Sequence, residues 1–205
     1  MATKDMVISP VGRVEGDLDV RVTIEDNVVV DAWTEAAMFR GFEIILRGKD
    51  PQAGLIVTPR ICGICGGSHL YKSAYALDTA WRTELPPNAI LIRNIAQAAE
   101  TMLSIPRWFY ALFAIDLTNK KYARAKGYDE VVRRFAPFVG TGYERGVAIS
   151  NKPAEVYAMF GGQWPHSSFM IPGGVMCAPT LAEVSRSLAI LDQWRDQWLE
   201  SDWLG

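Results

Sequence analysis

Cysteine and histidine, the residues that most often bind transition metals or form disulfides, are scarce in this sequence. It has three cysteines and two histidines in 205 residues. An odd number of cysteines does not form the paired framework of a small secreted scaffold, so a reducing compartment, or a metal that protects the thiolates, fits better. A net charge of −2 and the lack of a Lys/Arg run give no electrostatic case for binding nucleic acid.

A long apolar run and an export signal are also missing. The longest apolar stretch, around residues 108–115, is too short for a membrane-spanning helix. The segment 1–5 lacks a basic region followed by an apolar one, so no cleaved signal is visible. We therefore expect a cytoplasmic chain that reaches a membrane only through partners.

Two of the cysteines and one histidine lie together in residues 60–69, with the sequence RICGICGGSH. Cys62 and Cys65 are three residues apart, and His69 follows four residues later. The glycines of this stretch let the backbone turn tightly, so that both sulfurs can reach one metal. A helix predicted over about 68–81 places Cys65 near the positive end of the helix dipole, which favours the metal-binding thiolate.

Spacing alone leaves three interpretations of this stretch open. It is compatible with a structural zinc site completed by Cys177 or His166, with a redox-active dithiol, and with a site for another metal. Cys177 and His166 are eleven residues apart and form no recognisable second metal-binding motif.

The hydrophobic pattern changes along the chain from a period of two to a helical period. Apolar residues alternate with polar ones over 18–24, and Asp26 and Asn27 form a turn before a second β-type run at 28–33. Beyond residue 69 the chain is predicted to be mostly helical. The sequence therefore predicts a mainly α fold with an amino-terminal β-hairpin or sheet region (α+β). We expect residues 1–58 to be β-rich with a short helix, and residues 59–205 to be mostly helical.

Three helices are predicted in the second region besides the one at 68–81. One spans about 89–117 with a kink or interruption at Pro106, and another spans 128–138. The last begins at the capping box of Thr180 and Glu183. The helix over 89–117 is expected to be largely buried through apolar residues that include Ile90, Leu91, Ile95, Ala98, Met102 and Leu103. The last carries one apolar stripe: Leu181, Val184, Leu188, Leu191, Trp194 and Trp198.

The pattern Arg60-x-Cys62-Gly-x-Cys65-x-x-x-His69 resembles the first metal-binding motif in the large subunit of nickel–iron hydrogenases. Two earlier stretches resemble the same family in the same order, Arg13-Val14-Glu15-Gly16 and Arg40-Gly41-Phe42-Glu43. A later one is Gly161-Gly162-Gln163-Trp164-Pro165-His166, followed by Gly173-Gly174. The family usually has histidine where this sequence has Asp17.

The resemblance implies a binuclear centre of nickel and iron, with carbon monoxide and cyanide ligands on the iron. Cys62 would be a terminal ligand of nickel, and Cys65 would bridge the two metals. Soft thiolates suit these metals. His69 would donate a hydrogen bond to the bridging sulfur, and Arg60 would shape the same wall.

The resemblance also implies roles for two carboxylates and a second histidine. Glu15 would take the proton that is released when H₂ is split. Glu43 would bind Mg²⁺, and His166 would lie at the interface with an iron–sulfur small subunit. The alternatives for these three residues are a Glu15–Arg13 salt bridge, a Glu43 on an ordinary helix face and a His166 bonded to the backbone.

The second Cys-x-x-Cys pair of the family and the cysteines for iron–sulfur clusters are absent from this sequence. We therefore expect the amino-terminal part of a hydrogenase large subunit, which catalyses the reversible oxidation of H₂ to protons and electrons. Activity would need a chain with the second pair and an iron–sulfur small subunit. The alternatives are a non-enzymatic assembly module with a zinc knuckle and a hydrogenase-like respiratory subunit without the metals. Retention of Cys62 and Cys65 argues against the latter.

Overall fold

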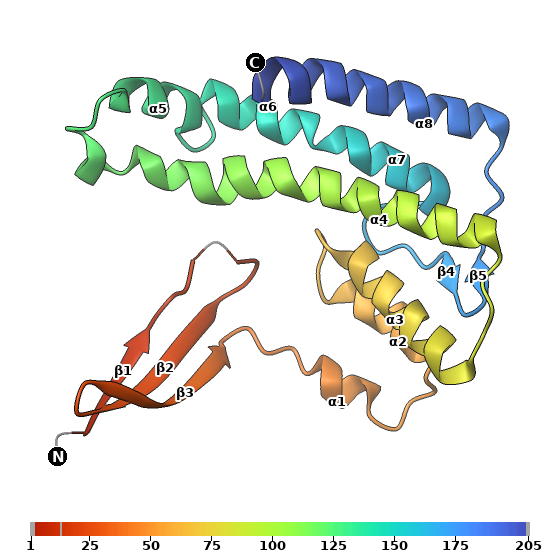
Figure 1. Cartoon of the computed structure of the whole chain (residues 1–205), viewed down its shortest axis with the longest axis horizontal. Coiled ribbons are helices and arrows are strands. Elements are labelled where there is room, and N and C mark those ends of the chain that lie inside the picture. Colours follow the sequence, from red (N-terminus) through yellow and green to blue (C-terminus); the bar gives the residue numbers. More distant parts are fainter. Residues whose placement is uncertain (1–2, 13, 204–205) are drawn as a thin grey trace. The chain divides into compact units, whose positions relative to one another are not determined.

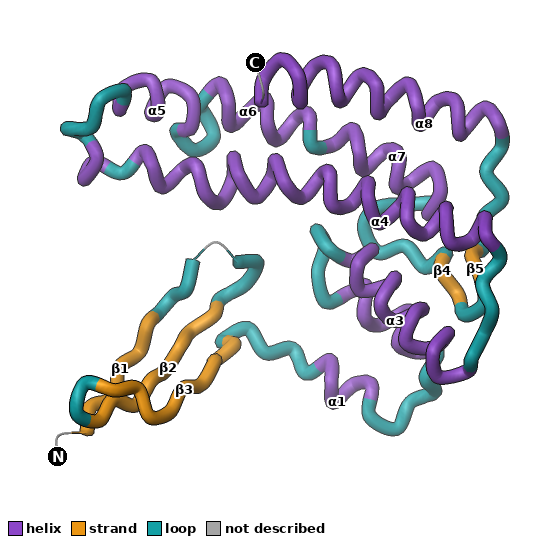
Figure 2. The backbone as a smooth tube through the Cα atoms, viewed as in Figure 1, coloured by secondary structure: helices purple, strands orange, loops and turns teal. Residues whose placement is uncertain are grey.

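The chain folds into two compact units, Met1–Gly41 and Phe42–Gly205. The computed structural model describes residues 3–12 and 14–203. The first unit is a small β-sheet and the second consists mainly of helices (Figure 2). The fold class predicted from the sequence is therefore confirmed.

The first unit is a three-stranded antiparallel sheet in the order β1–β2–β3 (Figure 1). Its strands are β1 (Thr3–Ile8), β2 (Leu18–Glu25) and β3 (Val28–Ala36). The predicted hairpin is β2–β3, in which Asp26 and Asn27 have φ values of 48° and 65°. Asn and Asp tolerate this left-handed conformation, which a tight two-residue hairpin turn requires.

The second unit begins with short helical elements that lead to the cysteine stretch. These are α1 (Phe42–Leu46), α2 (Ala53–Val57) and the 3₁₀ helix η1 (Thr58–Arg60). The predicted helix follows as α3 (Gly66–Trp81) and ends at Arg82, which has a left-handed φ of 57°. Cys62 and Cys65 thus lie between η1 and the start of α3.

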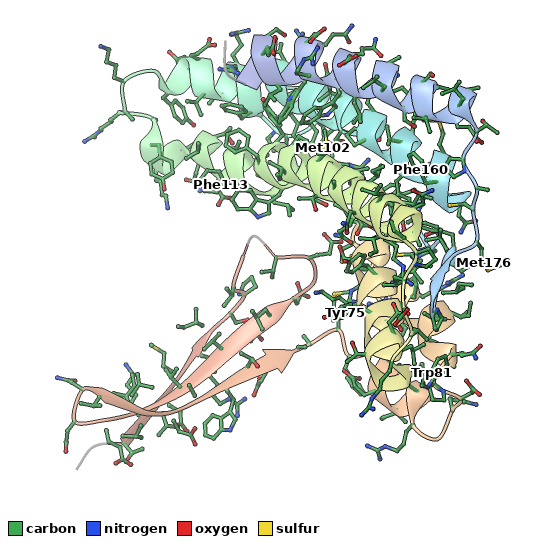
Figure 3. All side chains as sticks on the ribbon, turned by 45° about the vertical axis from the view of Figure 1, so that its right-hand side comes forward. Tyr75, Trp81, Met102, Phe113, Phe160 and Met176 are labelled. Atoms are coloured by element: carbon green, nitrogen blue, oxygen red, sulfur yellow. The ribbon has the colours of Figure 1, made fainter. Side chains whose placement is uncertain are left out.

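Three longer helices pack beside one another in the second unit: α4 (Pro87–Arg107), α7 (Asn151–Gly161) and α8 (Leu181–Trp194) (Figure 1). Helix α3 packs against α4. Figure 3 shows the side chains, with Phe160 labelled on α7. The main core joins these helices through buried residues that include Leu70, Ala74, Ile92, Ala96, Val156, Tyr157 and Phe160.

The helix predicted over 89–117 is divided into three segments. Helix α4 runs through Pro106 to Arg107, and the chain continues as the π-helix η2 (Trp108–Phe113) and the 3₁₀ helix η3 (Ala114–Thr118). Proline cannot donate to the carbonyl four residues before it, so the missing hydrogen bond lies within α4, which nevertheless continues past Pro106. The remaining helices here are η4 (Lys120–Tyr122), α5 (Tyr128–Phe135) and α6 (Thr141–Ile149).

The expectation that α4 is buried on nearly all sides is wrong for this chain. Ile90, Leu91 and Ile95 are 43%, 58% and 40% exposed. The buried positions of α4 are instead Ala89, Ile92, Arg93, Ala96, Ala99, Glu100, Leu103 and Pro106. Small alanines let the neighbouring helix approach closely, so the contact face is not the most hydrophobic one.

The apolar stripe predicted for the last helix is buried only toward its end. The capping box at Thr180 and Glu183 is confirmed, but Leu181, Val184 and Leu188 are exposed. Ser187 and Ile190 take the buried positions instead. Trp194 and Trp198 are buried, with ring centroids 4.7 Å apart, and the chain continues from α8 as the π-helix η5 (Arg195–Trp203).

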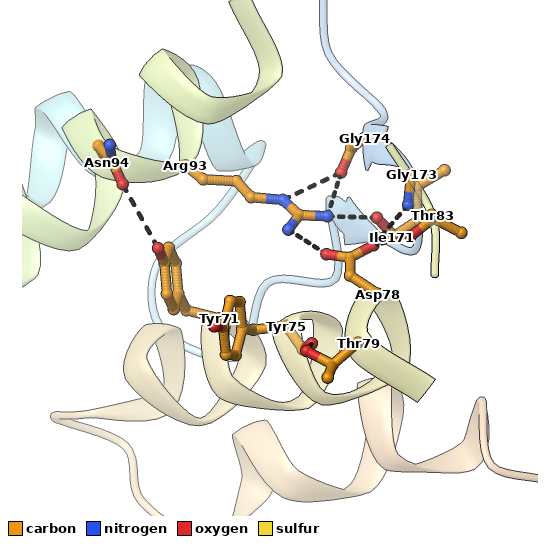
Figure 4. A network of polar contacts seen from close by, with 10 residues as sticks. All are labelled: Tyr71, Tyr75, Asp78, Thr79, Thr83, Arg93, Asn94, Ile171, Gly173 and Gly174. Carbon is orange, nitrogen blue, oxygen red and sulfur yellow. Dashed lines mark hydrogen bonds and ion pairs between the residues drawn. The ribbon is translucent and has the colours of Figure 1, made fainter. Parts of the chain in front are cut away.

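A buried ion pair ties α3 and α4 to the short hairpin of β4 (Met170–Ile171) and β5 (Gly174–Val175) (Figure 4). Arg93 donates to Asp78 at 2.6 Å and to the carbonyl of Gly174 at 2.9 Å. Asp78 also accepts hydrogen bonds from Thr83 and the Gly173 N–H, each at 2.7 Å. Burial opposes ionisation, but these bonds and the charge of Arg93 together lower the pKa of the Asp78 carboxyl.

Over the two described ranges, no helix combines the length and hydrophobicity needed to cross a membrane.

Candidate metal centre

The two cysteines of the motif form a single turn at the start of α3. Both thiols are partly exposed, neither is in a disulfide, and Cys65 is the residue that precedes the helix. The Cys65 N–H donates to the Cys62 Sγ at 3.3 Å. Cysteine binds metals as the thiolate, so the two sulfurs of this turn are suitable metal ligands.

Arg60 and His69 lie on either side of this turn in the same continuous segment. The His69 N–H donates to the Cys65 carbonyl at 3.2 Å, and the His69 carbonyl accepts from Thr58 Oγ1 at 3.3 Å. Arg60 is exposed, and its guanidinium donates to the Ile56 carbonyl at 2.7 Å. These contacts fix the backbone around the cysteines, and the predicted roles of both side chains at a metal stay predictions.

The loop that contains His166 packs against the cysteine turn. His166 Nδ1 lies 2.7 Å from the Pro59 carbonyl oxygen, which can only accept, so Nδ1 carries the proton. Gly66 also packs closely against Pro59. A Cβ at position 66 would lie 2.8 Å from the Pro59 carbonyl oxygen, so there is no room for a side chain. His166 therefore makes the backbone hydrogen bond of the structural alternative, and its place at a subunit interface stays a prediction.

Glu100 of α4 also lies near the cysteine turn, although the sequence did not predict it as a site residue. Its side chain is 1% exposed and accepts from the Gly67 N–H at 2.7 Å and the Ser68 N–H at 2.6 Å. Ser68 Oγ donates to it at 2.7 Å and Trp164 Nε1 at 3.3 Å. Glu100 lies four residues after Ala96, on the face of α4 that is buried in the structure, and no local pattern in the sequence marks this face.

Tyr157 completes the packing around the start of α3. It is fully buried, and its hydroxyl forms a 2.7 Å hydrogen bond with Ser167. Burial raises the pKa of Tyr157 to about 12, with help from the charge of Glu100 and against the effect of the Ser167 bond. The phenol is therefore neutral at physiological pH, and it closes the apolar side of the turn.

The two predicted functional carboxylates are both exposed in the structure. Glu15 lies in the first unit, and its alternative partner Arg13 is outside the described residues. Glu43 lies in the first turn of α1, in the second unit. Their predicted roles, as proton acceptor and Mg²⁺ ligand, stay predictions.

The donor set around the turn fits a soft metal but is incomplete. Two thiols leave one turn, and thiolates suit nickel, iron and zinc. Residues 3–12 and 14–203 contain no group of three or more His, Cys, Asp or Glu that could hold a metal ion. Burial and the charge of Glu183 raise the pKa of the Cys177 thiol, which packs against the core. A four-ligand site would therefore need donors from elsewhere.

Several known proteins are similar to this chain in sequence and in fold. Residues 40–132 match the family model described as nickel-dependent hydrogenase. The chain is 34% identical over 196 residues to the periplasmic [NiFeSe] hydrogenase large subunit of Desulfomicrobium baculatum, which covers 89% of the chain. The chain belongs to the nickel-dependent hydrogenase family. It is also 31% identical over 200 residues, 93% of its length, to the hydrogenase-2 large chain of Escherichia coli K12.

Solved hydrogenase structures share the fold of this family member. A [NiFeSe] hydrogenase structure from Dm. baculatum matches 97% of the chain with a TM-score of 0.76 and 30% identity. The reduced Ni-Fe-Se hydrogenase of D. vulgaris Hildenborough matches 95% with a TM-score of 0.74. The chain covers 44% and 42% of those two structures, and 38% and 35% of the Desulfomicrobium and Escherichia sequences. The similarity identifies it as an amino-terminal part of a hydrogenase large subunit.

Proposed function

We propose that this chain is part of the catalytic subunit of a nickel–iron hydrogenase that oxidises H₂ reversibly to protons and electrons. Cys62 and Cys65 supply one of the two cysteine pairs of the metal centre. The observation that carries the proposal is the single turn that contains both thiols, in which the Cys65 N–H donates a hydrogen bond to the Cys62 sulfur. The similarity to hydrogenase large subunits over nearly the whole chain supports the same function.

The proposed centre draws its remaining ligands from a chain that carries the second Cys-x-x-Cys pair. When bound, nickel and iron with carbon monoxide and cyanide ligands supply the redox and Lewis-acid chemistry. This chain contributes the two thiolates, with His69 and Arg60 beside them. Electrons leave through an iron–sulfur small subunit, with His166 at that interface. Glu43 binds Mg²⁺, for which an oxygen ligand is suitable.

Metal analysis of the purified complex tests the proposed cofactor directly. We expect nickel and iron in equal amounts, and infrared bands from carbon monoxide and cyanide on the iron. The Cys62→Ser and Cys65→Ser variants should lose both metals, because oxygen is a poorer ligand for them. Zinc alone, without the infrared bands, would instead support the assembly module with a zinc knuckle.

Glu15 is the proposed first proton acceptor. Replacing Glu15 with Gln removes the group that can take up a proton but keeps its size. We expect the metals to stay bound while hydrogen/deuterium exchange with H₂ gas falls to background. Glu25→Gln, an exposed glutamate of the same unit, is the matched control and should keep full exchange. Full exchange in the Glu15 variant would refute the assignment.

The proposed compartment is the cytoplasm. None of the three cysteines is in a disulfide, and a reducing compartment keeps cysteines in that form. The Desulfomicrobium relative is named as periplasmic, so the two locations need to be separated by experiment. Fractionation of the source cells tests this: recovery of the chain with periplasmic markers would overturn the proposed location.

A further inference from the structure

Glu100 joins two helices at the point where the cysteine turn ends. It extends from α4 to the first turn of α3, which is 32 to 33 residues earlier in the sequence. At 1% exposure the side chain is shielded from bulk water, so its two oxygens need hydrogen-bond donors within the protein. The backbone N–H groups of Gly67 and Ser68, Ser68 Oγ and Trp164 Nε1 supply them.

All the groups that face the Glu100 carboxylate are donors. The two N–H groups and the indole can only donate. The Ser68 hydroxyl accepts from Gln97 Nε2 at 2.7 Å, and it therefore directs its own proton to Glu100. A carboxylate accepts at both oxygens, whereas an amide places an NH₂ group where one of them was. Either orientation of a glutamine would therefore direct an N–H against a backbone N–H of α3.

The two backbone donors continue directly into the metal-binding turn. The first N–H groups of a helix have no partner within the helix, and Glu100 satisfies those of Gly67 and Ser68. Cys65 immediately precedes this turn, and its own N–H binds the Cys62 sulfur. A displacement of the start of α3 from α4 would therefore move the Cys65 backbone and disturb the hydrogen bond that holds the Cys62 sulfur.

We infer that Glu100 is a positioning residue for the metal ligands Cys62 and Cys65, and that it acts through the backbone of Gly67 and Ser68. This inference rests on the proposed function, because it assigns Glu100 to the same metal site. It contacts no metal and takes no part in the reaction. Residues that orient metal ligands typically change metal affinity by roughly 10- to 100-fold when they are replaced.

The test uses the full 205-residue chain under anaerobic conditions, titrated with Co²⁺. Charge-transfer absorption from thiolate to cobalt in the near ultraviolet reports how many sulfurs bind. Glu100→Gln removes an acceptor, and Glu100→Asp keeps the charge but withdraws both oxygens by one methylene. We expect both variants to bind Co²⁺ at least about tenfold more weakly and with a weaker charge-transfer band. Two variants are used so that misfolding of one does not decide the result.

Two controls separate positioning from a general loss of stability. Tyr71→Phe removes a different side-chain hydrogen bond between α3 and α4, from the Tyr71 hydroxyl to Asn94, and leaves every donor to Glu100 in place. Asp78→Asn removes the buried ion pair with Arg93 in the same unit, and the hydrogen bonds of Asp78 go to Arg93, Thr83 and Gly173 (Figure 4). Both controls should keep the wild-type affinity and absorption.

The outcomes distinguish the inference from the proposed function. A folded Glu100 variant with wild-type Co²⁺ affinity overturns the inference alone, and so does an equal loss in Asp78→Asn. Absence of any thiolate band in the wild-type chain contradicts the proposed metal-ligand role of the cysteines, and the inference fails with it. A loss confined to the two Glu100 variants supports both.

Discussion

Gly67 occupies a position with no room for a side chain. A Cβ there would lie 2.6 Å from the Tyr157 ring and 2.7 Å from Glu100 Oε1. We expect Gly67→Ala to lower the free energy of unfolding by about 1–3 kcal/mol, because the buried groups must move apart. Urea denaturation of the full chain, followed by circular dichroism, measures this.

Gly63 provides the matched control for this prediction. It belongs to the same motif, but a Cβ there would have no heavy atom within 4 Å. Gly63→Ala should change the free energy of unfolding by less than about 0.5 kcal/mol. Equal losses in the two variants would show that the glycines serve chain flexibility and not the close packing of Gly67.

At the scale of single residues, the sequence allowed prediction of the cysteine turn but not of the carboxylate behind it. Cys62, Cys65 and the glycines are neighbours along the chain, so their spacing alone predicts a turn. Glu100 is far from them in sequence, and a glutamate on a helix is normally expected at the surface. Its burial is explained by donors of another helix, which no local pattern reveals.

The Asp78–Arg93 pair joins α3, α4 and the β4–β5 hairpin, so its protonation affects three elements at once. The pKa of the Asp78 carboxyl is lower in the folded chain than its ordinary value of 3.8. Its contribution to stability is therefore complete above about pH 4 and is lost as the pH falls through the lower folded pKa.

We expect Asp78→Asn to lower the free energy of unfolding at pH 7 by about 3 kcal/mol, since Arg93 keeps its charge but loses its buried partner. The variant should also lose less stability than the wild type between about pH 5 and pH 2. Urea denaturation across this range measures both effects. Glu130→Gln, at an exposed pair with Arg133, is the control and should leave the unfolding free energy at pH 7 nearly unchanged. Parallel pH curves for wild type and Asp78→Asn would contradict the assignment.

At the scale of elements, prediction succeeded where the signal is local. The β2–β3 hairpin, α3 and the capping box of α8 each follow from adjacent residues. Helices α6 and α7 were not predicted, because α6 contains two glycines and α7 has a proline near its start. The buried faces of α4 and α8 were misassigned because neighbours that are distant in sequence determine which positions are covered.

At the scale of the whole molecule, much apolar surface stays exposed. Leu181 and Leu188 of α8 are 82% and 60% exposed, and Leu91 of α4 is 58% exposed. The chain spans 38% of the length of the Desulfomicrobium large subunit. Under the proposed function, these faces are covered by the chain that supplies the second cysteine pair.

The β-sheet of the first unit also exposes many apolar side chains. Every residue of β1 and β3 is exposed, including Val28, Val29 and Val30 at 62%, 54% and 53%. A three-stranded sheet without a packed face is at best marginally stable, since little apolar area offsets the loss of chain entropy. We expect the backbone amides of this sheet to exchange with deuterium at least about a hundredfold faster than those around the fully buried Leu70 and Leu103.

Hydrogen-exchange mass spectrometry of the full chain, with and without its partner chains, tests this difference. Peptides from β2 should become protected when the partners are added, while peptides around Leu103 should change little because their amides are already protected in the unit core. Gly127, an exposed position in the second unit, marks the unprotected limit in both samples. Strong protection of β2 in the chain alone would mean that the sheet is stable by itself, and would contradict the role proposed here for partner contacts.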